Sequence, residues 1–97
     1  MPKYAAPVRV FVIGAGQVGS TIVEALYEEH VLIVLDTEIS RLQALNARFD
    51  VAVFEGDGTS RKDLAAAGVA TTDLVIACTS RDEVNLVAGM FARREVH

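Results

Sequence analysis

Residues Val8–Ser20 read VRVFVIGAGQVGS. An apolar run rich in β-branched residues ends at Gly14, the glycines follow G-x-G-x-x-G spacing, and a helical pattern begins beyond them. A strand, a glycine turn and a helix in this order are typical of domains that bind a dinucleotide at the turn. Gly14 allows the tight turn, Gly16 lets a pyrophosphate approach the backbone, and Gly19 lets the helix lie close to the strand. The free N–H groups and positive dipole end of the helix would face the phosphates.

An acidic residue completes this pattern. Asp36 directly follows the apolar run 31–35, about 20 residues after the turn, where dinucleotide-binding domains place the acid that binds a ribose. Its carboxylate would repel a 2′-phosphate, so NAD or NADH is favoured over the NADP forms. Two alternatives stay open: a turn that binds no ligand, and an Asp36 that is only a solvated strand-end or N-cap residue.

Composition restricts the class of protein. The chain has 97 residues, 52% of them hydrophobic, which predicts one small domain with a core. No apolar run approaches the roughly 20 residues of a membrane span, and no signal peptide is evident. The single cysteine excludes an internal disulfide and favours the cytoplasm. A net charge of −4 argues against nucleic-acid binding.

The chain alternates strands and helices after an N-terminal tail, residues 1–7, and we expect one domain over 8–97. The predicted strands are 8–13, 31–35, 51–54 and 74–78, and the predicted helices are 17–29, 39–47, 61–67 and 81–94. Such alternation predicts an α/β fold, a Rossmann-like doubly wound parallel sheet with helices on both faces. The expected strand order is 3-2-1-4, truncated because a full domain would add further strands.

Helical spacing predicts which side chains face the sheet. In the first helix these are Val18, Ile22, Val23 and Leu26, and in the second they are Leu42 and Leu45. We expect the fourth strand to be an apolar edge, so the chain would be a fragment of something longer, or a dimer that buries this edge or the last helix.

A second glycine loop follows the third strand. Asp57 could accept a hydrogen bond from an exocyclic amine, and Gly58 would allow a base to come close. The alternative is a turn that only caps the next helix, since Ser60 and Asp63 resemble a capping box. Gly68 would end that helix.

Four further residues each have a functional and a structural interpretation. Arg41 could reach the adenosine or a phosphate, or it could be a surface arginine. Thr79 lies where the second half of a dinucleotide would pass, whereas Cys78 is expected to be an apolar filler. His30 falls at the opposite end of the sheet and is expected to be a loop residue, so no catalytic constellation and no metal site is predicted.

Together these motifs resemble the TrkA N-terminal domain, also called the KTN or RCK domain, over residues 8–95. The resemblance is carried by VxVIGAGQVG at 10–19, VLD at 34–36, GDGT at 56–59, and LVIACT at 74–79 followed by Asn85. Gly58 stands where the family often has alanine, a difference expected to be harmless.

The resemblance implies a cytoplasmic regulator that binds NAD or NADH, or alternatively ATP, ADP or AMP, and is not an enzyme. It implies homo-oligomers, from dimers to gating rings, on a membrane-embedded potassium transporter or channel subunit at the inner face of the plasma membrane. The residues implied to hold the nucleotide are Gly14, Ala15, Gly16, Gln17, Val18, Gly19, Asp36, Arg41, Asp57, Gly58 and Thr79. A fragment of an NAD-dependent dehydrogenase and a nucleotide-free interaction module are the competing interpretations.

Overall fold

The computed structural model describes residues 7–78. Predictions for residues 1–6, Thr79 and the helix 81–94 lie outside this range. The elements, in chain order, are β1 (Arg9–Ile13), α1 (Gln17–Leu26), β2 (Val31–Asp36), α2 (Ile39–Arg48), β3 (Ala52–Glu55), α3 (Arg61–Ala66), the 3₁₀ turn η1 (Val69–Thr71) and β4 (Leu74–Ala77). Every strand and helix predicted within the described range is present, and only α1 differs by more than two residues at an end.

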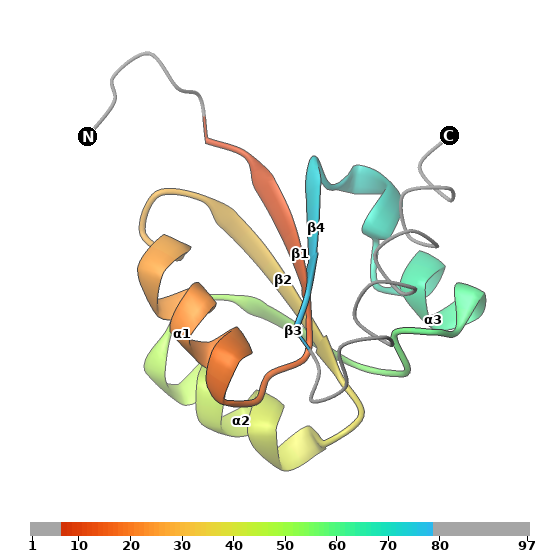
Figure 1. Ribbon diagram of the computed structural model, residues 1–97, viewed down its shortest axis with the longest axis horizontal. Helices are drawn as coiled ribbons and strands as arrows, with labels where there is room; N and C mark the ends of the chain where they lie inside the picture. The colour runs from red at the N-terminus through yellow and green to blue at the C-terminus, as the bar shows by residue number, and fades with distance from the viewer. Residues whose placement is uncertain (1–6, 79–97) are drawn as a thin grey trace.

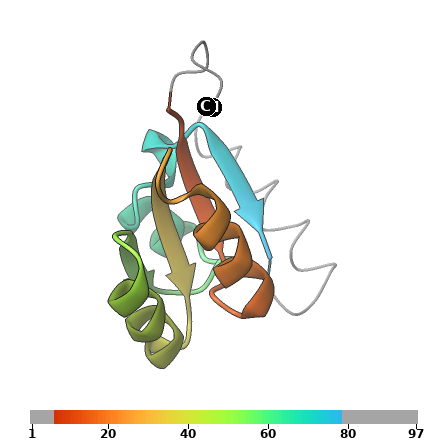
Figure 2. The ribbon, with the colours of Figure 1, turned by 90° about the vertical axis from the view of Figure 1, so that its left-hand side faces the viewer.

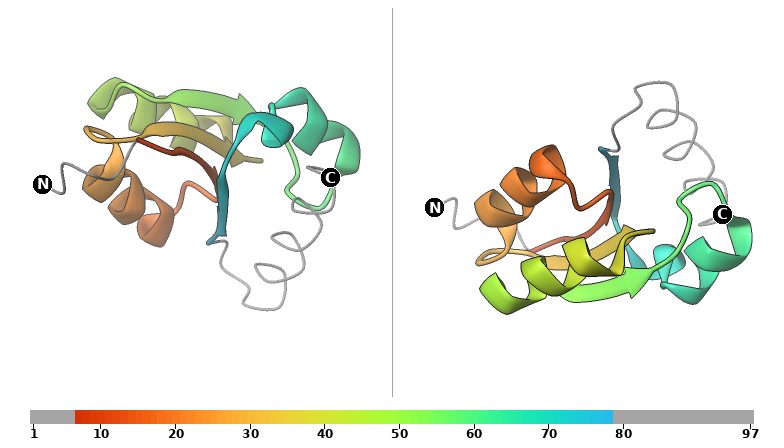
Figure 3. Two further views of the ribbon diagram at one scale, coloured as in Figure 1. Left: turned by 90° about the horizontal axis from the view of Figure 1, so that it is seen from above. Right: turned by 90° about the horizontal axis from the view of Figure 1, so that it is seen from below.

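The four strands form one parallel sheet in the order β3-β2-β1-β4, which confirms the predicted topology. Figures 1 and 3 show this succession across the sheet. The strand order reverses between β1 and β4, so the switch point of the sheet lies between these two strands. A crevice at this switch point is where doubly wound sheets bind ligands.

Helices cover both faces of the sheet, with α1 and α2 on one face and α3 with η1 on the other (Figure 2). Side chains alternate between these layers along each strand. Val10 and Val12 pack toward α1 and α2, whereas Phe11 and Ile13 pack toward Leu64 of α3. Leu42 and Leu45 of α2 are buried, as the helical spacing predicts.

The prediction for α1 is wrong in two respects. The helix ends at Leu26 and not at Glu29, because the amides of Glu29 and His30 both donate to the Leu26 carbonyl and turn the chain into β2. Val18 is 61% exposed and does not face the core. It lies on the first helical turn, beside the cleft at the carboxyl end of the sheet.

The amino ends of the strands carry structural contacts. His30 lies there in a loop, as expected, and its Nδ1 accepts a hydrogen bond from the Val8 amide at 3.1 Å. Gly68 follows α3 with a φ of 90°, the left-handed conformation predicted for a glycine that ends a helix. No helix within residues 7–78 combines the length and apolar character that crossing a bilayer requires.

Candidate functional site

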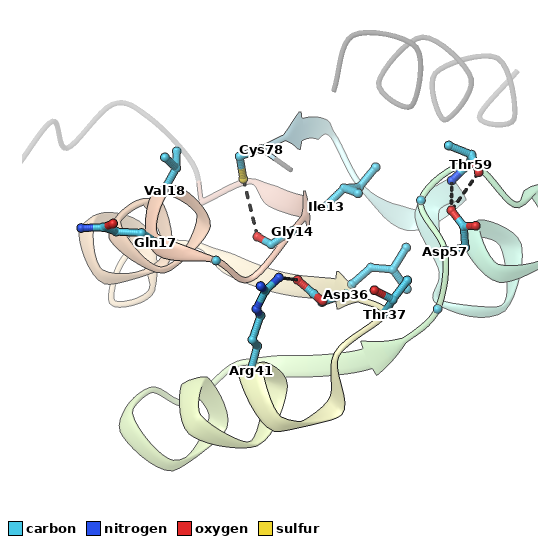
Figure 4. Close-up of a pocket in the computed structure, with 14 residues that line it drawn as sticks. Ile13, Gly14, Gln17, Val18, Asp36, Thr37, Arg41, Asp57, Thr59 and Cys78 are labelled. Carbon is cyan, nitrogen blue, oxygen red and sulfur yellow. Dashed lines mark hydrogen bonds and ion pairs between the residues drawn. The ribbon is translucent and has the colours of Figure 1, made fainter. Parts of the chain in front are cut away.

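A cleft of about 420 Å³ opens at the carboxyl ends of β1, β2 and β3 (Figure 4). This volume lies within the usual range of small-molecule sites. The structure brings the following predicted site residues to it: Gly14, Gly16, Gln17, Val18, Asp36, Arg41, Asp57 and Gly58. Residues separated by more than 40 positions in the chain thus meet at one site.

The glycine turn has the geometry that its sequence predicts. Gly14 has a φ of 109°, and its amide donates to the Leu35 carbonyl at 2.7 Å. A Cβ added to Gly16 would meet nothing within 4 Å, so the backbone there is open to the cleft. A Cβ added to Gly19 would collide with the Gly14 carbonyl, because α1 packs directly against the end of β1.

Asp36 reaches from the end of β2 to the glycine turn. Its Oδ2 accepts a hydrogen bond from the Ala15 amide at 2.7 Å, and its Oδ1 accepts one from the Glu38 amide at 2.7 Å. The residue is 8% exposed. Asp36 is therefore not the solvated strand-end residue of the alternative interpretation. It does accept from the amide of Glu38, the N-cap residue of α2.

Arg41 projects from the first turn of α2 into the cleft (Figure 4). Its Nη1 lies 3.8 Å from Oδ2 of Asp36, and its side chain is 56% exposed. The guanidinium thus adds a positive charge to the mouth of the cleft while its outer part stays in water.

The second glycine loop is held by its own side chains. Oδ1 of Asp57 accepts from both the amide and the hydroxyl of Thr59, each at 2.8 Å. These bonds, the amide first, lower the pKa of the Asp57 carboxyl. Ser60 accepts from the Asp63 amide at 3.2 Å, which confirms half of the predicted capping box. Asp63 bonds instead to the Asp57 amide at 2.8 Å.

Gly58 is packed more tightly than its sequence context suggests. A Cβ added there would collide with Cγ2 of Ile13, a buried side chain at the end of β1. In this chain an alanine at position 58 would therefore not fit unless Ile13 or the loop moved. The absence of a side chain brings the second loop against β1 and so closes one wall of the cleft.

Two predicted residues lie behind the cleft surface. Ala15 is buried and already donates its amide to Asp36, and Gly19 packs under Gly14. The sequence reasoning missed other lining residues, all of them strand-end or loop neighbours of the predicted ones: Ile13, Leu35, Thr37, Gly56, Thr59 and Cys78. Their position at the carboxyl ends of strands was the available signal.

Cys78 forms part of the cleft floor next to the switch point. It is buried, and its Sγ lies 3.6 Å from the Gly14 carbonyl oxygen. Burial, and then the negative charge of Asp36, raise the pKa of this thiol. Cys78 therefore remains a protonated filler at neutral pH, in agreement with the sequence interpretation. Among residues 7–78, no group of His, Cys, Asp or Glu side chains is arranged to hold a metal ion.

Comparison with known proteins identifies the family. The TrkA-N domain family matches this chain over residues 10–97. The Trk system potassium uptake protein TrkA of Haemophilus influenzae is 41% identical over 81 residues, which are 82% of this chain and 18% of that protein. A TrkA homolog of Archaeoglobus fulgidus is 34% identical over 86 residues, 89% of this chain and 20% of that protein. The chain thus spans about a fifth of the length of these curated relatives.

Solved structures share the fold at low sequence identity. The X-ray structure of Pen from Bacillus thuringiensis matches with a TM-score of 0.69 at 18% identity, covering 94% of this chain and 33% of that one. SirC, a precorrin-2 dehydrogenase, matches with a TM-score of 0.63 at 15% identity, covering 86% of this chain and 40% of that one. At these identities the likeness shows a Rossmann-like fold alone. The family match and the curated relatives go further, and by them the chain belongs to the TrkA-N domain family.

Proposed function

We propose that this chain is the nucleotide-binding regulatory domain of a potassium uptake system. NAD or NADH, or alternatively ATP, ADP or AMP, would bind in the cleft and shift the conformation of an assembled complex. The relatives are named Trk system potassium uptake proteins, and these names support a role in potassium uptake. The geometry of the cleft supports the class of ligand.

One observation carries the proposal. The open backbone at Gly16 and the carboxylate of Asp36 border the same cleft, joined through the Ala15 amide. A diphosphate lying on the turn would therefore place its ribose beside Asp36. A carboxylate has about four lone-pair sites and the two backbone amides use two, so capacity for ribose hydroxyls remains.

The other residues take roles that follow from their positions. The turn from Gly14 to Gly19 would hold the phosphates, with the amides of Gln17 and Val18 at the start of α1. Arg41 would approach a phosphate or the ribose. Asp57 and Gly58 would border the adenine, and Thr79 would lie near the distal half of a dinucleotide.

Regulation requires that the nucleotide bind two states of the assembly unequally. A tenfold difference in affinity is worth about 1.4 kcal/mol per site, and equivalent sites in an oligomer would add. The proposed assembly is a homo-oligomer bound to a membrane-embedded potassium transporter or channel subunit. It would be cytoplasmic and lie at the inner face of the plasma membrane.

The alternative is a dehydrogenase-like activity, because SirC, a precorrin-2 dehydrogenase, has a similar fold. Within residues 7–78 the ionisable groups around the cleft are Asp36, Arg41, Asp57 and Cys78. The first three are engaged in hydrogen bonds or an ion pair, and the thiol is protonated. This set favours binding without turnover, so the domain is proposed not to be an enzyme.

Isothermal titration of the purified chain with NAD, NADH, ATP and ADP, and with NADPH for comparison, tests the proposal. We expect saturable binding of at least one of them below millimolar concentration, and weaker binding of NADPH than of NADH. Absence of binding by all four at millimolar levels would contradict the proposal and favour a nucleotide-free interaction module. Oxidation of NADH at a rate proportional to protein concentration would favour the dehydrogenase.

A further inference from the structure

We infer that Asp36 is a positioning residue for the phosphates, in addition to its proposed contact with the ribose. It would fix the glycine turn in the shape that receives a diphosphate, before any nucleotide arrives. This inference rests on the proposed function, but it concerns a different part of the ligand. It therefore predicts that Asp36 matters even for a ligand that has no ribose.

The contacts of Asp36 support such a role. Its two carboxylate oxygens bond to two amides on different segments, Ala15 in the glycine turn and Glu38 at the start of α2. Both bonds are 2.7 Å long. The residue is almost entirely buried, so water competes little for these bonds.

The glycine turn needs an external support. Ala15 stands between Gly14 and Gly16, and glycine has the most conformational freedom to lose on folding. Two adjacent bonds tie this part of the turn to the end of β2: the Gly14 amide to the Leu35 carbonyl, and the Ala15 amide to Asp36. The first is made by backbone alone, whereas the second depends on one side chain. The second bond holds the Gly14–Ala15 peptide, whose carbonyl otherwise accepts from the Cys78 thiol, a weak donor, at 3.6 Å. Without the second bond, this peptide would lose its stronger tie and could rotate.

Replacement of Asp36 gives two effects of opposite sign. Asp36→Asn removes a negative charge beside an anion site and releases Arg41 from its ion pair, which by charge alone should strengthen pyrophosphate binding. The same change leaves one oxygen to accept from two amides, because the other end of the Asn amide is a donor. If Asp36 positions the turn, pyrophosphate binding should weaken despite the favourable change in charge.

Asp57→Asn is the matched control. It removes the same charge from the same cleft, but both hydrogen bonds that the Asp57 side chain accepts from Thr59 go to one oxygen. Asparagine keeps that oxygen, so the second loop keeps its bonds. The two variants therefore share the charge change and differ in whether a backbone amide loses its acceptor.

The experiment is a titration of the ¹⁵N-labelled chain and both variants with pyrophosphate and, separately, with ADP. We expect Asp36→Asn to weaken pyrophosphate binding by about fivefold or more. Asp57→Asn should instead strengthen it slightly, because it removes a negative charge from the cleft and leaves the Thr59 amide its acceptor. In the absence of ligand, the Ala15 amide proton should move upfield and exchange faster in Asp36→Asn, and not in Asp57→Asn.

Each outcome separates this inference from the proposed function. Equal or tighter pyrophosphate binding by Asp36→Asn, with ADP binding weakened, overturns the positioning role and leaves the nucleotide site intact. An unchanged chain that binds ADP but no pyrophosphate also overturns it. Failure of the unchanged chain to bind any nucleotide overturns the proposed function itself.

A second variant covers the case in which Asp36→Asn does not fold. Asp36→Glu keeps the charge and both oxygens but displaces them by one methylene. It should weaken pyrophosphate binding through geometry alone, and unchanged binding would overturn the inference. Thermal unfolding of each variant shows whether it is folded under the conditions of the titration.

Discussion

The two glycine loops that border the cleft are built in different ways. The first, residues 14–19, is held from outside, by Leu35 and Asp36 of the neighbouring strand. The second, residues 55–60, is held by its own side chains and by Asp63 in the helix that follows. The first loop therefore depends on a side chain from the neighbouring strand, whereas the side-chain hydrogen bonds of the second loop join residues at most six positions apart. The second loop is tied to β2 by a backbone bond, from the Gly56 amide to the Asp36 carbonyl at 3.0 Å.

The glycines of the two loops also differ in how much space surrounds them. Of the glycines at positions 16, 19, 56 and 58, only Gly16 has open space where a side chain would be. Gly19, Gly56 and Gly58 are crowded by the protein itself. One glycine thus leaves room for a ligand, and the others bring pieces of the chain together.

The largest expected effect comes from Gly19→Ala in the first loop. The new methyl group would collide with the backbone carbonyl of Gly14, which cannot move without shifting α1 from β1. We expect a loss of about 3 kcal/mol or more in the free energy of unfolding, measured with urea. Gly16→Ala is the control, with a loss of about 1 kcal/mol or less, because Gly16 is the N-cap of α1 and alanine is a poorer N-cap than glycine. Equal stability of the two variants would show that α1 does not pack as described.

Gly16→Ala should instead remove nucleotide binding. Its methyl group fits the folded protein but would occupy the place proposed for the pyrophosphate. We expect affinity for NADH or ADP to fall by about 100-fold, or about 2.7 kcal/mol, by calorimetry. An affinity equal to that of the unchanged chain would show that the turn is not part of the binding site.

A smaller effect is expected from Gly58→Ala in the second loop. Its methyl group would press on Cγ2 of Ile13, so the unfolding free energy should fall by about 1–2 kcal/mol. Combining it with Ile13→Ala makes room for the methyl group. The double-mutant cycle should therefore show a favourable coupling of about 1 kcal/mol. Strictly additive losses would mean that the loop does not rest on β1.

The smallest effect concerns the charge of Asp57. Its pKa is lowered in the folded state, so the contribution of its bonds to Thr59 is complete above the ordinary carboxyl pKa of 3.8 and is lost as pH falls through the lower folded value. A carbon-detected NMR titration of the Asp57 carboxyl should give a pKa below that ordinary value, with the Thr59 amide shifting in parallel. A value at or above the ordinary one would mean that the second loop is not held this way.

Much of the fold could be predicted because local signals agreed. The apolar runs, the glycine turns and the alternation of elements each predict the same parallel sheet, and its order is confirmed. Val18 shows where this reasoning fails. Helical spacing places Val18 on the same face as Val23, but it cannot indicate that Val18 lies beside the cleft at the end of the sheet.

The meeting of predicted residues at one cleft followed from the sequence more readily than the hydrogen bonds between them. Gly14, Asp36 and Asp57 lie at or just beyond the carboxyl ends of different strands, and parallel strands bring these ends to one edge of the sheet. The division of Asp36 between two amides, and the contact of Gly58 with Ile13, depend on distances between segments remote in sequence. The spacing of residues within one segment could not have predicted these two contacts.

The most direct test of the central claim is amide shift mapping of the ¹⁵N-labelled chain during titration with NADH. Binding at the proposed site predicts saturable shifts at the amides of residues 14–19, with smaller ones at 36–41 and 56–59, and little change around Tyr27 and His30 at the opposite end of the sheet. Saturable shifts centred on that opposite end, or none at all at millimolar NADH, would contradict the claim that this cleft is a nucleotide site.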